Sequence, residues 1–274
     1  AKADAPGIII RDFNLESGGE PAEEYLGRFR NAVSKIAGKY PWIKVWCPNG
    51  ELFSKYPVSW WSREGTPEAA FVNFIKIQKA FLEGVKAGNP DAKVYPDSPS
   101  NMSPDGGIAS ISKNLEESNK VGVKYDMIAC HNYRKSPESP DLDADTQTLL
   151  RELGKNGYDV APVLWGEGMH YGPYTIPQWG VESASWLPPQ CWRYGALSYG
   201  LGWHEAISAA YRARSWLVAL KYQDRIISYM SGAQYNNFEM DLLLTPFATQ
   251  KIPNTIGRLL GDATFKKDIR FAPY

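Results

Sequence analysis

The sequence has few of the residues on which metal sites and disulfide-stapled folds depend. It has 274 residues but only three cysteines and three histidines. Cys47, Cys130 and Cys191 are too scattered for a disulfide framework or a zinc knuckle, and no HExxH or CxxC spacing occurs. Cys130 lies beside His131, but neighbours in a strand point to opposite faces. We therefore expect no catalytic metal, and a buried structural Cys130 rather than a thiol nucleophile.

The sequence also lacks the motifs and patterns of several other common function classes. No GxGxxG or P-loop pattern marks a nucleotide site, and no GxSxG elbow marks a serine hydrolase. Thirty Lys and Arg balance thirty Asp and Glu, so no basic field favours nucleic acid or an anionic membrane. No apolar run approaches the roughly 20 residues of a membrane span, and residues 1–4 do not begin a signal-peptide core. We expect no cofactor, nucleic acid or membrane partner, and we favour a secreted or periplasmic protein.

Aromatic residues are present in surplus. Ten Trp, sixteen Tyr and ten Phe make up 13% of the chain. Such rings suit a cleft that stacks sugars, although a large core also takes up aromatics. The length allows one large domain, and no linker or repeat signals a break. The sequence therefore predicts a single domain over residues 1–274, with residues 261–274 as the start of a C-terminal β segment.

Strand-like and helix-like segments alternate along the chain. We expect strands at 7–13, 42–47, 93–97, 125–133, 159–167 and 225–230. Helical periodicity covers 21–40, 67–88, 108–115, 145–155, 207–222 and 253–260. Repeated βα units predict an α/β protein with a parallel sheet, either an open doubly wound sheet or a (β/α)8 TIM barrel. Polar groups at many strand ends favour the barrel, of which about six βα units are visible here.

One strand end carries the strongest chemical signal. The largely apolar stretch 160–165 runs into Glu167, which stands between Gly166 and Gly168. A buried parallel strand delivers an acid to the rim of a sheet in this way. We interpret Glu167 as the catalytic centre; the alternative is an ordinary strand-end glutamate in solvent. Other candidates stand at or just past the expected strand ends: Glu51, Asp97, His131, Tyr133 and Tyr229.

Four stretches carry a family resemblance, namely 46–49, 95–99, 126–133 and 165–167. Together they resemble strands four to seven of the clan A retaining glycoside hydrolases. Within that clan the sequence looks most like family thirty-nine and its agarase- and porphyranase-like relatives, over about residues 7 to 270. The resemblance implies that Glu167, at the end of strand seven, is the nucleophile, and that His131 or Tyr133 contacts it.

Two departures from the family pattern matter. Those families usually present an Asn-Glu pair after strand four, with the Glu as acid/base, whereas this chain reads Cys47-Pro48-Asn49-Gly50-Glu51. If the loop carries an extra residue, Asn49 and Glu51 take those roles. If instead Pro48-Asn49 aligns with the family's Asn-Glu pair, the acid is lost. By this alignment the chain also starts at about the third strand. We expect either a truncated chain, or a missing segment or partner chain that completes the barrel.

The sequence therefore predicts a retaining glycoside hydrolase acting on a plant or algal polysaccharide, with Glu167 as nucleophile and Glu51 as acid/base. The alternative is a catalytically impaired barrel that binds glycans or serves as a structural or assembly subunit. The predicted substrate-binding residues are Trp46, Asn49, Asp97, His131, Tyr133, Trp165, His170, Tyr171 and Tyr229.

Overall fold

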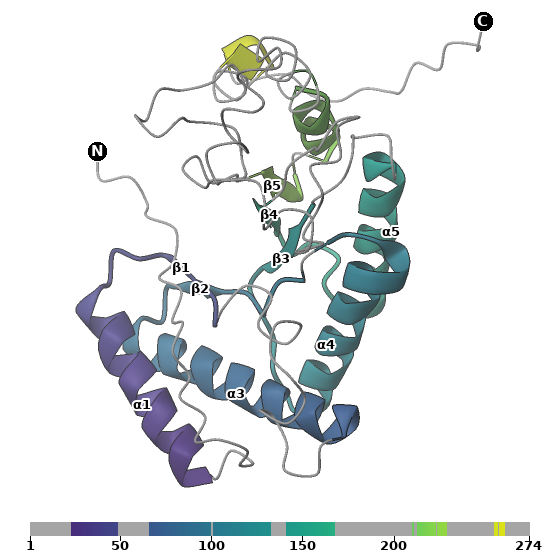
Figure 1. Cartoon of the computed structure of the whole chain (residues 1–274). Coiled ribbons are helices and arrows are strands. Elements are labelled where there is room, and N and C mark those ends of the chain that lie inside the picture. Colours follow the sequence, from purple (N-terminus) through teal and green to yellow (C-terminus); the bar gives the residue numbers. More distant parts are fainter. Residues whose placement is uncertain are drawn as a thin grey trace, which may run out of the picture. The chain divides into compact units, whose positions relative to one another are not determined.

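The computed structural model describes residues 23–48, 66–99, 101–132, 141–167, 210, 213–222, 224–228, 255–256 and 258–260. The helices are α1 (Glu23–Lys39), α3 (Pro67–Gly88), α4 (Ala109–Lys120) and α5 (Leu142–Lys155), and a π-helical turn, η2 (Pro104–Ile108), leads into α4. The strands are β1 (Val45–Trp46), β2 (Lys93–Val94), β3 (Ile128–His131), β4 (Val163–Glu167) and β5 (Ile226–Ser228) (Figure 1). Residues 213–221, 255–256 and 258–260 are also helical.

Within the described residues, the predicted alternation of strands and helices is confirmed, while the strand expected at 7–13 lies outside them. Helix α3 has the predicted bounds because its ends are well specified. Thr66 caps it by accepting a hydrogen bond from the Ala69 N–H, and Pro67 fits the first turn. Strand β1 is shorter than expected. The Ile43 N–H bonds the Tyr40 carbonyl in a turn, which removes residues 42–43 from the strand.

The chain divides into two compact units, which are described separately. The first comprises Ala1–His131 and Thr146–Leu164, and the second Asn132–Asp145 and Trp165–Tyr274. In the second unit, Lys221 forms a 2.8 Å ion pair with Asp143, and the Tyr222 hydroxyl donates a 2.6 Å hydrogen bond to the same carboxylate. These contacts fix the helix at 213–221 against the first turn of α5. The single domain over 1–274 stays a prediction.

Helices α1 and α3 pack closely in the first unit, as Figure 1 shows. Leu26 of α1 joins a buried cluster with α3 residues that include Phe71 and Phe74. Farther along the two helices, glycine makes the contact between α3 and α1. A Cβ added to Gly84 would lie 2.6 Å from the Arg30 carbonyl oxygen, so only glycine allows the two backbones to approach this far.

A ladder of parallel backbone hydrogen bonds organises the strands of the first unit. The Lys93 N–H donates to the Lys44 carbonyl at 2.8 Å, and the Tyr95 N–H to the Trp46 carbonyl at 3.1 Å. This sets Val45 opposite Lys93 and Trp46 opposite Val94 in a parallel pair. A separate three-stranded sheet has the order β3-β4-β5.

Further bonds continue the ladder beyond β2. The Asp126 N–H donates to the Val94 carbonyl at 2.9 Å, the His131 N–H to the Pro99 carbonyl at 3.1 Å, and the Ile128 N–H to the Pro162 carbonyl at 2.9 Å. Residues opposite one another in such a ladder lie on the same face, and successive residues alternate between faces. Trp46 and Val94 therefore share one face, and Cys47 and Tyr95 share the other. A hydrogen bond between the Cys47 and Tyr95 side chains agrees with this register.

The Cys47 thiol should be inert in the folded protein. Burial raises its pKa to about 12, the Tyr95 hydrogen bond lowers it, and the negative charge of Asp97 adds to the increase. Because only the thiolate reacts with disulfide reagents, we expect no labelling of Cys47 at pH 8. The measurement is mass-spectrometric counting of labelled cysteines in a Cys191→Ser variant, in which Cys47 and the equally buried Cys130 remain. Labelling should appear only on unfolding; fast labelling of native protein would contradict the placement of β1.

The Gly84 contact predicts opposite effects for two glycine substitutions in this helix pair. Gly84→Ala should lower the free energy of unfolding by about 1–3 kcal/mol, because the new methyl group collides with backbone that cannot yield. Gly27→Ala in α1 is the matched control, since an added Cβ there meets nothing within 4 Å. It should stabilise the helix by about 0.5–1 kcal/mol. Urea denaturation measures the free energy of unfolding of both variants. Equal changes in the two variants would contradict the close packing at Gly84.

Candidate active site

The structure describes the side chains of four predicted site residues, Trp46, Asp97, His131 and Trp165, and places the backbone of Glu167 as the last residue of β4. The other predicted site residues lie outside the described residues: Asn49, Glu51, Tyr133, His170, Tyr171 and Tyr229.

Trp46 is a core residue of the first unit. Its side chain is fully buried on the face that it shares with Val94, and its indole N–H donates a 3.1 Å hydrogen bond to the Ile43 carbonyl. The ring therefore supports the turn that precedes β1. Its role as a substrate contact stays a prediction.

Asp97 stands three residues beyond β2, on the same face as Cys47 and Tyr95, and is half-buried. Its backbone N–H donates a 2.8 Å hydrogen bond to the side-chain oxygen of Gln78 in α3. The Gln78 amide in turn donates to the Asn114 side chain of α4 at 3.2 Å, and this pair is buried. Two helices thus hold the end of β2 in place, through a residue, Gln78, that the sequence did not single out.

The Asp97 carboxylate also acts on buried neighbours through its charge. Burial is the main reason that the pKa of the Tyr125 phenol lies above its usual value; a hydrogen bond with Ser118 lowers it, and the charge of Asp97 raises it further. The charge of Asp97 has the same effect on the Cys47 thiol. Asp97 therefore brings negative potential to the carboxyl end of β2, where a parallel α/β barrel keeps its chemistry.

His131 ends β3 and is only 4% exposed. Its Nε2 lies 3.1 Å from the Ser98 hydroxyl oxygen. His131 stands five residues after Asp126, which is opposite Tyr95 in the ladder, so alternation places it on the face of Trp46 and Val94. The structure therefore brings His131 to Ser98, and its predicted contact with the nucleophile stays a prediction.

Asn132 and Trp165, both in the second unit, carry buried polar atoms that no described residue pairs with. Asn132 is 1% exposed and Trp165 is fully buried. Neither the amide nitrogen and oxygen of Asn132 nor the indole nitrogen of Trp165 has a hydrogen-bond partner in the part of the chain that the structure describes. Sequence reasoning missed Asn132, because His131 and Tyr133 on either side of it carried the stronger chemical signals.

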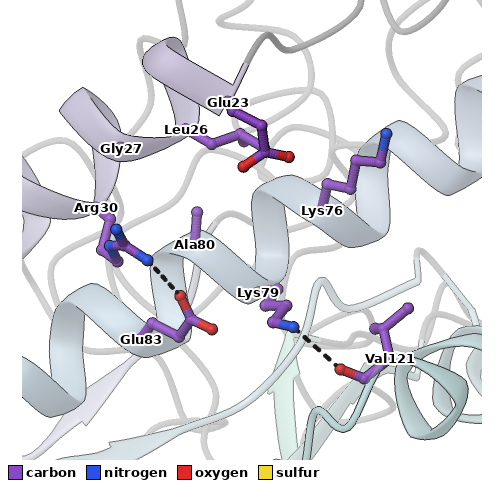
Figure 2. Close-up of a pocket in the computed structure, with 9 residues that line it drawn as sticks. All are labelled: Glu23, Leu26, Gly27, Arg30, Lys76, Lys79, Ala80, Glu83 and Val121. Atoms are coloured by element: carbon purple, nitrogen blue, oxygen red, sulfur yellow. Dashed lines mark hydrogen bonds and ion pairs between the residues drawn. The ribbon is translucent and has the colours of Figure 1, made fainter.

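A separate hollow of about 310 Å³ lies between α1 and α3 (Figure 2). Long charged side chains dominate its lining. Arg30 and Glu83 form a 3.0 Å ion pair across it, and the Lys79 ammonium donates a 3.2 Å hydrogen bond to the Val121 carbonyl. The hollow belongs to the helix layer of the first unit, and none of the predicted site residues lines it.

Within the described ranges, no three His, Cys, Asp or Glu side chains come together in a way that would hold a metal ion. Of the helices in those same ranges, none combines the length and the apolar character needed to cross a membrane.

No protein-family model matches the chain, and no curated protein matches it. Solved structures do. Xylanase 10B from Thermotoga petrophila RKU-1, in complex with xylobiose, has a TM-score of 0.56 at 14% identity, with 86% of this chain and 67% of that chain covered. A thermostable mutant of a xylanase from Cellvibrio japonicus has a TM-score of 0.56 at 13% identity, with 87% of this chain and 73% of that chain covered.

A family 51 α-L-arabinofuranosidase from Bifidobacterium longum has a TM-score of 0.51 at 15% identity, with 79% of this chain and 45% of that chain covered. The chain thus spans roughly two thirds of the first xylanase and less than half of the arabinofuranosidase. At these identities the likeness concerns the fold. The chain has the (β/α)8 TIM-barrel fold that the sequence predicted.

Proposed function

We propose that this chain is the catalytic barrel of a retaining glycoside hydrolase that cleaves a polysaccharide or oligosaccharide by double displacement. The observation that carries the proposal is that β4 ends at Glu167. In TIM-barrel enzymes the catalytic groups come from the carboxyl ends of the strands, and an acid at that position suits attack on a sugar. The fold adds support, because the solved structures that share it include xylanases and an arabinofuranosidase.

In the proposed mechanism the Glu167 carboxylate attacks the anomeric carbon, while Glu51 donates its proton to the departing glycosidic oxygen. The glycosyl–Glu167 ester is then hydrolysed by a water molecule, from which Glu51 removes a proton. Each carboxyl group returns to its starting state, so the cycle is balanced. The two carboxyl groups must lie about 5–5.5 Å apart for this double displacement.

The two acids need different pKa values, because one attacks as an anion and the other begins protonated. Trp165, two residues before Glu167, is fully buried. Removing water raises the pKa of a carboxyl group, whereas hydrogen bonds to the charged form lower it. We propose that Glu51 lies in the drier surroundings and that substrate and protein donors stabilise the anion of Glu167.

The resemblance of the stretches 46–49, 95–99, 126–133 and 165–167 to family thirty-nine and to agarase- and porphyranase-like enzymes narrows the proposal to plant or algal polysaccharides. Such polymers are met outside the cell, which is why we propose a secreted or periplasmic protein. Asn49, Asp97, Tyr133, His170, Tyr171 and Tyr229 remain proposed substrate contacts.

A second function is favoured by one observation, the spacing Asn49-Gly50-Glu51 in place of an adjacent Asn-Glu pair. If that spacing keeps Glu51 away from Glu167, the barrel would bind glycans or act as an assembly subunit without cleaving them. Binding without turnover separates this function from hydrolysis.

Glu167→Gln should abolish hydrolysis, because the amide is a poor nucleophile and forms no glycosyl ester. We expect kcat to fall by roughly a thousandfold or more with unchanged folding. The measurement is product release from xylan, agarose, porphyran and a panel of aryl glycosides. Glu83→Gln is the control, since Glu83 is a half-buried residue of α3 that pairs with Arg30 and belongs to none of the predicted site positions. A Glu167→Gln enzyme as active as Glu83→Gln would contradict the assignment.

The acid/base role of Glu51 predicts a dependence on the leaving group. Glu51→Gln should slow the release of alkyl or sugar leaving groups strongly, because these need a proton. With a dinitrophenyl glycoside, whose leaving group needs none, formation of the glycosyl ester should be nearly unaffected. Burst and steady-state kinetics on the two substrate types measure this difference. Equal losses on both would show that Glu51 has another role.

A further inference from the structure

The ladder sets which residue just past the end of β3 stands beside the end of β4. The two strands are consecutive and are joined by α5, the crossover that connects parallel neighbours. In a parallel pair, the 2.9 Å bond from the Ile128 N–H to the Pro162 carbonyl places Ile128 opposite Val163. Counting four residues along both strands places position 132 opposite position 167. Position 131, the neighbouring histidine, belongs to the other face.

The Asn132 side chain is buried at this place and is not paired with any described residue. Its carboxamide loses water on folding and regains no hydrogen bond from any residue that the structure describes, at 1% exposure. Buried polar groups in native proteins are nearly always paired, so an unpaired carboxamide next to a strand end requires an explanation. One explanation is a bound ligand that supplies the missing donor and acceptor.

Trp165 adds an independent observation in the same unit. Its indole N–H is also buried and unpaired among the described residues. It lies two positions before 167 in β4, and therefore on the same face as position 167 and position 132. Two neutral side chains on one face thus have one acceptor oxygen and two donor nitrogens that no described residue uses. Neighbouring sugar hydroxyl groups both donate and accept, whereas a phosphate or carboxylate would have no use for the acceptor.

We propose that Asn132 is a sugar-binding residue whose carboxamide accepts a hydrogen bond from one substrate hydroxyl and donates one to the next, beside Glu167. The Trp165 indole N–H is a further donor to the same sugar. This inference rests on the proposed function, because it names the side chains that hold the substrate at that site. It also assigns to Asn132 a role that the sequence gave to its neighbours His131 and Tyr133.

The first test separates a ligand-binding asparagine from a structural one by thermal stability. Asn132→Leu should leave the melting temperature unchanged or raise it, because an apolar group of similar size replaces an unpaired amide. Asn114→Leu is the matched control: the Asn114 oxygen accepts hydrogen bonds from Gln78 and Ser118. That variant should melt at a lower temperature. If Asn132→Leu and Asn132→Ala both lowered the melting temperature as much as Asn114→Leu does, Asn132 would hold the fold together, and the proposal would be overturned.

The second test measures sugar binding directly. Xylotriose and an agarose tetrasaccharide are titrated calorimetrically into Glu167→Gln, with and without Asn132→Leu, so that no substrate is consumed. The affinity for the better ligand should fall about tenfold or more when Asn132 is replaced, and kcat/KM should fall by a similar factor in the otherwise unchanged protein. Equal affinities, or no binding of either ligand, would overturn the proposal.

The two proposals fail differently. If the unchanged protein hydrolyses glycosides and Asn132→Leu does so equally well, the role of Asn132 is wrong and the hydrolase stands. If no glycoside is cleaved but the oligosaccharides bind and Asn132→Leu weakens that binding, the hydrolase is wrong and the sugar site stands.

Discussion

The structure depends on the register of one parallel hydrogen-bond ladder. Bonds from Lys93 to Lys44 and from Ile128 to Pro162 fix which strand residues stand opposite one another. Because side chains alternate between faces, this register decides in one step which residues enter the core and which line the opposite face. A slip by one residue would exchange Trp46 for Cys47 and His131 for Asn132. The candidate site therefore depends on backbone bonds as much as on its side chains.

The helices keep this ladder in place from the side. Lys86 of α3 pairs with Asp126 at 2.8 Å, and the Asp126 carboxylate also accepts a 2.8 Å hydrogen bond from the Val94 N–H. Gln78 of the same helix holds the Asp97 backbone. Helix α1 approaches α3 through glycines, so that the pair forms a closely packed layer. Functional groups at strand ends need such rigid support, since small displacements weaken both binding and catalysis.

Much of the fold was predictable from sequence because the signals were local. The cap at Thr66 and the proline after it fixed the start of α3, and the apolar stretch before Glu167 predicted β4. Cys130 was expected to be buried and structural, and its side chain is fully buried. The barrel was predicted from the alternation of these elements together with the polar groups at many strand ends, and the likeness to solved xylanase structures agrees with it.

What the sequence did not reveal was long-range. Nothing in the segment around Trp46 indicates that its indole N–H donates a hydrogen bond to the Ile43 carbonyl within the core. Asn132 was passed over for His131 because a histidine is the stronger chemical signal, although the register depends on a bond between residues 128 and 162. Gln78 was one of many polar residues on a helix until its contact with Asp97 became visible.

The most direct test of the central claim is to trap the covalent intermediate. An activated 2-fluoro glycoside of the sugar that the enzyme cleaves should inactivate the protein, because the fluorine slows hydrolysis of the glycosyl ester more than it slows its formation. Peptide mass spectrometry should then find one sugar on Glu167. Active enzyme that carries the sugar on another residue, or that forms no adduct and releases a product of inverted configuration, would contradict the account.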